Sequence, residues 1–594
     1  MNTPIASEAS RGGRTYRARK QRPCDACRKR KICCVRDSDA APCSLCQMRA
    51  QPCTYFSQPN VRRRRVNTSV SPPADIVGTL SLEESTVTHE PSVIVSRGST
   101  TKPEAHSGRR MAAEEWVSQF VGLSGDQDPY VLRHCEFSEN RYRRPDWACL
   151  RVKGGENTPT HFTIVPDTHL DARPAYYPSH PPIDLESGRH RRLMDAFFST
   201  VHTSFPIIDP RVFMDTTKEV DPPLLGAVYS LARTFSPQPA MTSHQASEWR
   251  QFLHQAFPME ARHPRLETIE AGLCFLQRHT EIHRAPTTPG LWSEIGSLVG
   301  MAHELGLNVD PSEWQISQTQ RSRRIRIAWT LFIFDKWAAL GLGRPSYISR
   351  DDWSVPVASE GDLPESDPSH QWDTPASSRL LFVAMTKLTL ILAELLQKFY
   401  TIKAMSAMRS KDPEDLLRIV KHFEEHLHLF FDEYFVPLRI LTNEESILDS
   451  TGTVELAYHT LQVVLYRAVL RHLPLEHAAQ VRQSARAALL AATSFLSSLQ
   501  VARLRAFWWS PISRINFAIV GSFMFSMLLS STDDTEIEFW TVQIDRYRRL
   551  LDMQSITFDT TKLAVKRLEL LSCVTSGPGE EGLFCQEPWD LCIQ

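Results

Sequence analysis

Apolar side chains recur every three or four residues along most of this chain, from about residue 113 to residue 572, in segments separated by proline and glycine. This spacing places the apolar side chains on one face of a helix. A clear example follows Asp412-Pro413, which supplies a capping residue and a first-turn proline. The apolar face of this predicted helix consists of Leu416, Val420, Phe423, Leu427 and Phe430.

A second apolar stripe runs from Leu291 to Leu305 and ends at Gly306, a residue type suited to the left-handed position after a helix. The same spacing predicts helices at 379–400, 455–470, 478–499 and 538–551. Convincing strand alternation is absent from this region. We therefore predict a mainly α protein, in which residues 113–575 form one large all-α domain.

No segment has the pattern of a membrane span. The longest convincing uncharged stretch, from Ile515 to Thr532, contains glycine and several serines. It is shorter than the ~20 apolar residues that cross a bilayer, so a buried helix is predicted. The N-terminal segment lacks the apolar core of a secretory signal, and we expect an intracellular protein. Thiols stay reduced there, which favours metal binding over disulfides where cysteines cluster.

Composition separates two further segments from this domain. Residues 58–112 begin with basic residues and are then rich in Ser, Thr and Pro, which predicts a disordered linker. Leu80, Val87 and Ile94 have heptad spacing, but a proline interrupts it, and no conventional zipper is predicted. Residues 576–594 combine acidic and bulky apolar side chains, the composition of an activation tail. A frayed terminus explains this tail equally well.

Charge is distributed unevenly along the chain. The 594 residues carry a net charge of -1, but residues 1–65 contain 16 Lys and Arg against 4 Asp and Glu, and the rest contain 51 against 64. A basic head on an acidic body favours an anionic partner for the head, with nucleic acid as the first candidate. The apolar fraction of 42% and charged fraction of 23% exclude a chain that is disordered throughout.

Seven of the 13 cysteines lie between positions 24 and 53. Zinc prefers four thiolates in a tetrahedron, so two zinc ions need eight sulfur contacts. Six cysteines supply eight contacts only if two of them bridge both ions, and we predict such a binuclear, pseudo-symmetric cluster. The six predicted ligands repeat the spacing C-x2-C-x6-C and are Cys24, Cys27 and Cys34, then Cys43, Cys46 and Cys53.

Two alternatives stay open for these cysteines. The two C-x2-C pairs alone have the spacing of a single-zinc ribbon, which leaves Cys34 and Cys53 unexplained at equivalent positions. Cysteines without a common role are the other alternative. Cys33 is spare, because its use in place of Cys34 would break the match between the two triplets.

The cysteine segment resembles the fungal binuclear zinc cluster DNA-binding domain, the galactose-regulator type of transcription factor. Besides the six cysteines, the likeness rests on Pro42 before the fourth cysteine and on the basic run from Arg28 to Lys31. The resemblance implies that Cys24 and Cys43 bridge two zinc ions. The family commonly has a basic residue before the third cysteine, where this chain has Cys33.

The resemblance also implies a short helix between the second and third ligands, which would carry Arg28, Lys29, Arg30 and Lys31. Arginine and lysine projected into the major groove from the start of a helix can pair with guanine O6 and N7. By resemblance, Lys31 is the candidate for reading a CGG-like triplet, with Arg30 beside it. Arg28 and Lys29 are expected to contact phosphate, which supplies affinity rather than sequence choice. A solvated basic face without a partner is the alternative.

Two further basic clusters flank the cysteines, and the predicted DNA-binding domain with its basic flank spans residues 1–57. Both clusters are candidates for phosphate contacts or for nuclear import signals, with an incidental solvated tract as the alternative. Their members are Arg17, Arg19, Lys20 and Arg22 before the cysteines and Arg62, Arg63, Arg64 and Arg65 after them.

The predicted helical body also resembles known proteins. Residues 191–213, 301–314 and 323–349 are similar to the middle region of fungal transcription factors. More loosely, 120–135 and 515–529 resemble a subgroup of nitrogen-utilisation and xylan-response activators. The likeness implies that the all-α domain is regulatory, and it identifies no small-molecule ligand.

Asp335 lies in an otherwise apolar helical segment. A buried carboxylate is commonly paired, and Arg344 is the partner we predict. Gly341, Gly343 and Pro345 are predicted to form a turn. Nothing at this turn resembles a phosphate-binding loop at a strand-to-helix junction.

Two histidine pairs could suggest a metalloenzyme. They are His279-x3-His283 and His422-x3-His426, and neither has glutamate directly after its first histidine. The general base of an H-E-x-x-H site is therefore missing, and exposed helical histidines are the better interpretation. No nucleophile elbow or Walker loop occurs either, so no enzyme is predicted.

These observations together predict a nuclear, zinc-dependent, sequence-specific DNA-binding transcription factor of RNA polymerase II genes, with two zinc ions per chain. Its expected partners are double-stranded DNA and the transcription machinery or co-regulators, with a homo- or heterodimer as one arrangement. The alternative, motivated by Cys33 and the missing heptad, is a co-regulator that acts through protein partners and does not need its own DNA contact.

Overall fold

The computed structural model of the chain describes four short segments near the N-terminus, at 24–29, 42–43, 46–47 and 52–55, and most of residues 116–572. The predicted linker, both basic flanks and the C-terminal tail lie outside the described residues. The chain divides into two compact units, Met1–Thr101 and Lys102–Gln594. Within residues 116–572 the gaps are 125, 144–146, 155–157, 167–176, 215–219, 239, 279–288, 365–371 and 444–447.

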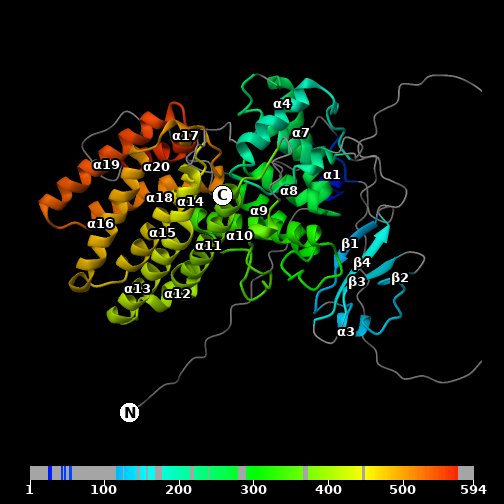
Figure 1. The fold of residues 1–594 in the computed structure, drawn as a ribbon, viewed down its shortest axis with the longest axis horizontal. Coiled ribbons are helices and arrows are strands. Elements are labelled where there is room, and N and C mark those ends of the chain that lie inside the picture. The colour runs from blue at the N-terminus through cyan, green and yellow to red at the C-terminus, as the bar shows by residue number, and fades with distance from the viewer. Residues whose placement is uncertain are drawn as a thin grey trace, which may run out of the picture. The chain divides into compact units, whose positions relative to one another are not determined.

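Helices form most of the second unit, so the mainly α fold class is confirmed (Figure 1). In chain order they are α3 (Pro129–Leu132), α4 (Gly188–Ala196), η3 (Phe197–Val201), α5 (Arg211–Met214), α6 (Pro222–Ala232), α7 (Ser243–Glu260), α8 (Leu266–Leu276), α9 (Leu291–Glu304), α10 (Gln318–Leu342), η4 (Glu360–Asp362), α11 (Ala376–Leu395), η5 (Leu396–Tyr400), α12 (Ile402–Met408), α13 (Pro413–Phe430), η6 (Phe431–Phe435), α14 (Val436–Asn443), α15 (Gly452–Leu470), α16 (Leu475–Ser497), α17 (Val501–Arg505), α18 (Ser510–Leu529), α19 (Asp534–Ser555), η7 (Asp559–Thr561) and α20 (Lys562–Ser572).

The helix boundaries follow the predicted caps. At the start of α13 the Asp412 carboxylate accepts a hydrogen bond from the Glu414 backbone N–H at 2.8 Å, and all five residues of the predicted apolar face are buried. Gly306 follows Leu305, the C-cap residue of α9, and has φ of 63°, which favours glycine. The other four predicted segments are also helical, in α11 with η5, α15, α16 and α19.

The start of the predicted all-α domain requires a correction, because residues 116–166 contain an antiparallel sheet. Its strands are β1 (Trp116–Phe120), β2 (Arg141–Arg143), β3 (Ala148–Lys153) and β4 (Thr160–Pro166), in the order β1-β4-β3-β2. In the register, Phe120 pairs with Phe162 and Leu150 also pairs with Phe162 from the other side.

The sequence pattern did not predict the sheet, because its strands are short and its apolar face packs against a residue from a distant part of the chain. Val152 and Phe162 are buried against Trp314, which lies between α9 and α10. The ring centroids of Phe162 and Trp314 are 5.6 Å apart in an edge-to-face arrangement. Strand propensity depends on such neighbours, which no window of sequence contains.

One hydrophobic cluster extends through the helical body from Leu193 on α4 to Leu568 on α20. Trp509, just before α18, lies at the point where early and late helices meet. Its ring contacts Phe205 and Phe334, and its indole N–H donates to the Ser204 carbonyl at 2.9 Å. The late helices therefore pack directly on the early ones.

Two described helical segments are long and apolar enough to cross a membrane, Ala376–Tyr400 and Ser510–Leu529. Within their most apolar windows, 61% and 78% of the residues are buried inside the fold. Both are core helices by this criterion, which agrees with the buried helix predicted from Ile515 onward.

Candidate metal centre and DNA-binding head

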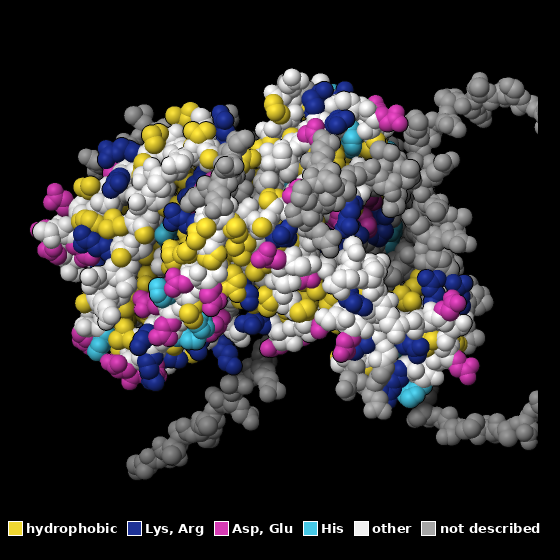
Figure 2. All heavy atoms as spheres, in the orientation of Figure 1, with side chains coloured by type: hydrophobic (Ala, Val, Ile, Leu, Met, Phe, Trp, Pro, Cys, Tyr) yellow, Lys and Arg dark blue, Asp and Glu magenta, His cyan; other side chains and the backbone are white. Residues whose placement is uncertain are grey.

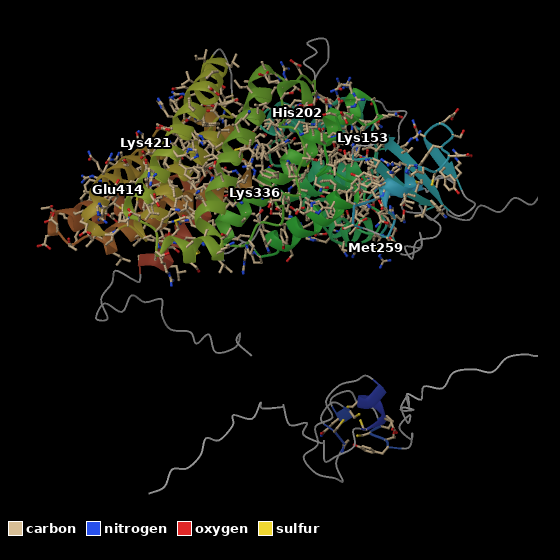
Figure 3. The ribbon with its side chains drawn as sticks, turned by 90° about the horizontal axis from the view of Figure 1, so that it is seen from below. Lys153, His202, Met259, Lys336, Glu414 and Lys421 are labelled. Carbon is tan, nitrogen blue, oxygen red and sulfur yellow. The ribbon has the colours of Figure 1, made fainter. Side chains whose placement is uncertain are left out.

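Four of the six predicted zinc ligands come together in the first unit. The Sγ atoms of Cys24, Cys27, Cys43 and Cys46 all lie within 4.8 Å of one another, and all four residues are fully buried. Figure 3 shows sulfur atoms gathered beside α1 (Asp25–Lys29). The described residues before position 30 and those after position 41 therefore contribute two cysteines each to one buried centre.

The sulfur spacing fits tetrahedral zinc. The Cys24–Cys43, Cys24–Cys46 and Cys27–Cys43 Sγ distances are 3.8, 3.7 and 3.6 Å. A tetrahedral ion with Zn–S bonds of about 2.3 Å places its sulfurs about 3.8 Å apart, whereas a disulfide requires about 2.05 Å. The donor set and its spacing thus suit a thiolate-bound metal and not a disulfide.

Cys53 lies at the edge of this centre and is partly buried against it. Its Sγ accepts a hydrogen bond from the Cys43 backbone N–H at 3.4 Å. The Thr54 carbonyl accepts from the Asp25 backbone N–H at 2.7 Å, which ties the segment of the last ligand to the start of α1. Cys34, the remaining predicted ligand, lies outside the described residues, as does Cys33.

The electrostatics of the centre favour thiolate at one of the two predicted bridging positions. The backbone N–H of Cys46 lowers the pKa of the Cys43 thiol to about 6. Burial raises the pKa of the Cys24 thiol above its usual range. Thiolate is the form that binds metal, so a cation at this centre would compensate the burial of Cys24.

The structure revises the position of the predicted basic helix. Helix α1 begins at Asp25, before the second ligand, so Arg28 and Lys29 lie near its end and not in its first turn. The acidic residue in the first turn is Asp25, which suits the helix dipole. The side chains of Arg28 and Lys29 are not described, and Arg30, Lys31 and the two flanking basic clusters lie outside the described residues.

Asp335 is buried as predicted, but its partner is not Arg344, which is exposed. Lys336 Nζ lies 3.0 Å from the Asp335 carboxylate, and the backbone N–H groups of Tyr347 and Ile348 donate to it at 2.8 and 3.1 Å. Lys336, labelled in Figure 3, lies within the helical body. Asp335 therefore fixes the loop after α10 and is fully engaged in structure.

The predicted turn at this loop is partly corrected as well. Gly343 has φ of 62° and caps α10, but Gly341 lies inside the helix. A Cβ atom on Gly341 would come within 2.4 Å of the Ile515 side chain on α18. Gly341 therefore permits a close approach of two helices.

Sequence reasoning about the second histidine pair missed a third residue. His422 and His426 lie on α13 and are partly exposed, as predicted, but Glu394 on α11 reaches both of them. Its position 28 residues before His422 carries no sequence signal for this contact. The first pair, His279 and His283, lies outside the described residues.

With this geometry established, comparisons with known proteins identify the class. Residues 194–450 match the fungal specific transcription factor domain. The resemblance to fungal transcription factors predicted from the sequence is confirmed by this match. The matched residues run from α4 to the loop before α15.

The relatives are named as fungal transcriptional regulators. Transcriptional activator protein DAL81 of Saccharomyces cerevisiae is 26% identical over 433 residues, covering 64% of this chain and 43% of its own length. An uncharacterized transcriptional regulatory protein of Schizosaccharomyces pombe is 25% identical, covering 79% of this chain and 77% of its own length. The Zn(2)-C6 fungal-type transcription factor FTF1a of Fusarium oxysporum is 24% identical, covering 60% and 33%.

This chain therefore spans less than half the length of DAL81 and about a third of that of FTF1a. No solved structure matches it.

Proposed function

We propose that this protein is a nuclear, zinc-dependent transcription factor that binds double-stranded DNA in a sequence-specific manner and regulates RNA polymerase II genes. The observation that carries the proposal is the buried cysteine quartet of the first unit, with sulfur spacings that suit tetrahedral zinc. Relatives named as transcription factors, one of them as Zn(2)-C6, support the same conclusion.

In this proposal the head holds two zinc ions through six cysteines. Cys24 and Cys43 each lie close to a cysteine of the opposite C-x2-C pair. The Sγ of Cys24 lies 3.7 Å from that of Cys46, and the Sγ of Cys43 lies 3.6 Å from that of Cys27. They also lie 3.8 Å from each other. These contacts support Cys24 and Cys43 as the bridging ligands, with Cys34 and Cys53 completing the two tetrahedra.

The bound zinc ions would supply folding energy to a segment too small to hold itself together by an apolar core. Side chains of the protein would then recognise the DNA sequence. Arg30 and Lys31 are proposed to contact guanine edges of a CGG-like triplet, and Arg28, Lys29 and the flanking basic clusters are proposed to contact phosphate. An overall basic head would make binding strongly dependent on salt.

The first experiment selects bound DNA from a random pool with the full chain at a stated salt concentration. We expect a CGG-like triplet in the selected sequences. Lys31→Ala should reduce the free-energy difference between binding to the selected triplet and binding to other sequences by about 1–3 kcal/mol. Lys29→Ala should weaken binding to all sequences alike. Unchanged selectivity in Lys31→Ala would contradict the assignment of base contact to this residue.

The metal count is tested separately, by elemental analysis of the full chain. The difference in bound zinc between the wild type and the double variant Cys24→Ser, Cys43→Ser should be two ions. Cys135→Ser, a partly exposed cysteine outside the head, serves as the control. A difference of one ion would favour the single-zinc ribbon, and no difference would contradict a zinc centre.

The alternative, a co-regulator whose own DNA contact is dispensable, predicts a different result in cells. If promoter occupancy survives in Cys24→Ser while the partner proteins remain bound, the chain is recruited by its partners. Loss of occupancy with partner binding retained favours direct DNA binding.

A further inference from the structure

Helix α13 carries His422 and His426 one turn apart, so their side chains lie on the same face. Their ring centroids are 4.1 Å apart. Glu394, at the end of α11, reaches this face with both carboxylate oxygens. Its Oε1 lies 3.3 Å from His422 Nε2, and its Oε2 lies 3.9 Å from His426 Nδ1.

The core of the body holds the two helices together beneath these three side chains. The buried face of α13 packs against α11 and α15, and Phe423 contacts Phe399 of η5 with ring centroids 6.0 Å apart. Glu394 lies between the buried residues Ala393 and Leu395. The backbone positions of all three side chains are therefore fixed by packing and not by the polar contact itself.

The three side chains are accessible from solvent. The exposed fractions of the His422, His426 and Glu394 side chains are 48%, 39% and 39%, so an ion can reach them without opening the core. Figure 2 shows histidine side chains among acidic and basic ones on the surface over α13. Lys421, the residue before His422, is labelled at this surface in Figure 3.

We propose that Glu394, His422 and His426 form a binding site for a divalent transition metal ion of the zinc class. One ligand atom from each residue lies within 4.8 Å of the other two. A tetrahedral ion with bonds of about 2.0–2.1 Å separates its ligand atoms by about 3.4 Å, so only small side-chain movements are needed. Two imidazoles select such ions over calcium or magnesium, which prefer oxygen ligands.

The site is not arranged for hydrolysis. Phe423 follows His422, so no carboxylate is in the position of a general base. Glu424 is engaged elsewhere, because its Oε1 accepts a hydrogen bond from the Tyr466 hydroxyl on α15 at 2.8 Å. An ion bound here would link α11 to α13 and stabilise the regulatory body when metal is available.

The proposal is tested with the full chain after its cysteine centre has been saturated with zinc and the zinc bound at any other site has been removed with a mild chelator. Co2+ is then titrated and followed by equilibrium dialysis and visible absorption, because cobalt bound by nitrogen and oxygen lacks the thiolate charge-transfer band of a cysteine site. We expect one more Co2+ per chain in the wild type than in the double variant His422→Asn, His426→Asn. We also expect Glu394→Gln to weaken that binding at least about tenfold.

The matched control is His428→Asn, a histidine of the same helix whose side chain is 77% exposed and whose Nε2 lies 3.4 Å from the Asp432 carboxylate. It should bind Co2+ as the wild type does. Equal Co2+ uptake by the wild type and the double variant would overturn the proposal and leave an ordinary polar contact between histidine and glutamate. Thermal unfolding with and without Co2+ gives a second measurement, in which only chains with the intact triad should be stabilised.

This result is independent of the proposed function. Repeating the titration in the Cys24→Ser, Cys43→Ser background separates the metal-site proposal from the proposed function. If the zinc cluster fails, the difference in bound Co2+ between the chain with the intact triad and the chain with His422→Asn, His426→Asn should stay unchanged.

Discussion

Several polar side chains of the helical body are buried, and each is held by partners distant in sequence. His202 is fully buried; its Nε2 hydrogen-bonds the Thr374 hydroxyl at 2.8 Å, 172 residues away. Arg326, also buried, donates to the carbonyls of Ile207 and Asp362 at 2.7 and 2.8 Å. Burial of a polar group costs less free energy when the group is hydrogen-bonded, so each of these hydrogen bonds restricts which helix arrangements are possible.

His202 should make the stability of the body depend on pH. Burial, together with the nearby positive charge of Arg326, lowers the pKa of His202 from 6.5 to about 3. Below pH 6.5, His202 is therefore protonated in the unfolded chain but stays neutral in the folded chain until the pH approaches 3. The stabilisation is complete above pH 6.5 and is lost as pH falls toward 3, by on the order of 1.4 kcal/mol per pH unit.

The measurement is the free energy of unfolding in urea at pH 7 and at pH 5. His202→Gln should be less stable at pH 7 but should lose about 2 kcal/mol less than the wild type on acidification. His428→Gln, at an exposed position, should lose as much as the wild type. An equal loss in all three chains would refute a neutral buried His202.

At the scale of helices and strands, the close approach of two helices explains glycines whose role the local sequence pattern does not reveal. Gly341 allows α10 to lie against Ile515 of α18, and Gly272 allows α8 to lie against Leu298 of α9. Gly300 in α9 has no atom within 4 Å of a Cβ built upon it. Three glycines in helices thus have two different consequences, set by their neighbours.

Replacement of these glycines by alanine should change stability in opposite directions. Gly341→Ala forces Ile515 to move and should destabilise the body by about 1–3 kcal/mol, because overpacking outweighs the better helix propensity. Gly300→Ala meets open space and should stabilise it by about 0.5–1 kcal/mol. Denaturant unfolding of both variants beside the wild type checks the signs, and stabilisation by Gly341→Ala would show that the two helices separate easily.

At the scale of the whole molecule, the chain combines two units that are stabilised in different ways. The described part of the first unit has four buried cysteines and few other apolar residues around them. The second has one continuous apolar cluster from Leu193 to Leu568. A unit with a buried cysteine centre thus precedes a body that is stabilised by burial of apolar surface.

Removal of metal should therefore affect the two units differently. A chelator should abolish sequence-specific DNA binding in a gel shift, while the far-UV circular dichroism of the helical body stays nearly unchanged at 25 °C. Re-addition of zinc should restore binding. A large loss of helical signal with chelator would mean that the body itself requires metal to fold.

The amino-acid sequence by itself determined the fold class, the helix caps and the two C-x2-C pairs that the structure brings together, because these depend on spacing and on residue types within a few turns of chain. Asp412, Gly306 and the C-x2-C pairs act on neighbours that a short window contains. The tertiary structure alone decided the antiparallel sheet, the pairing of Asp335 with Lys336 and the approach of Glu394 to His422 and His426. The sheet and the contact of Glu394 depend on how segments far apart in the chain pack around a shared core, and the pairing of Asp335 depends on how the turn after α10 folds back. No local spacing carries that information.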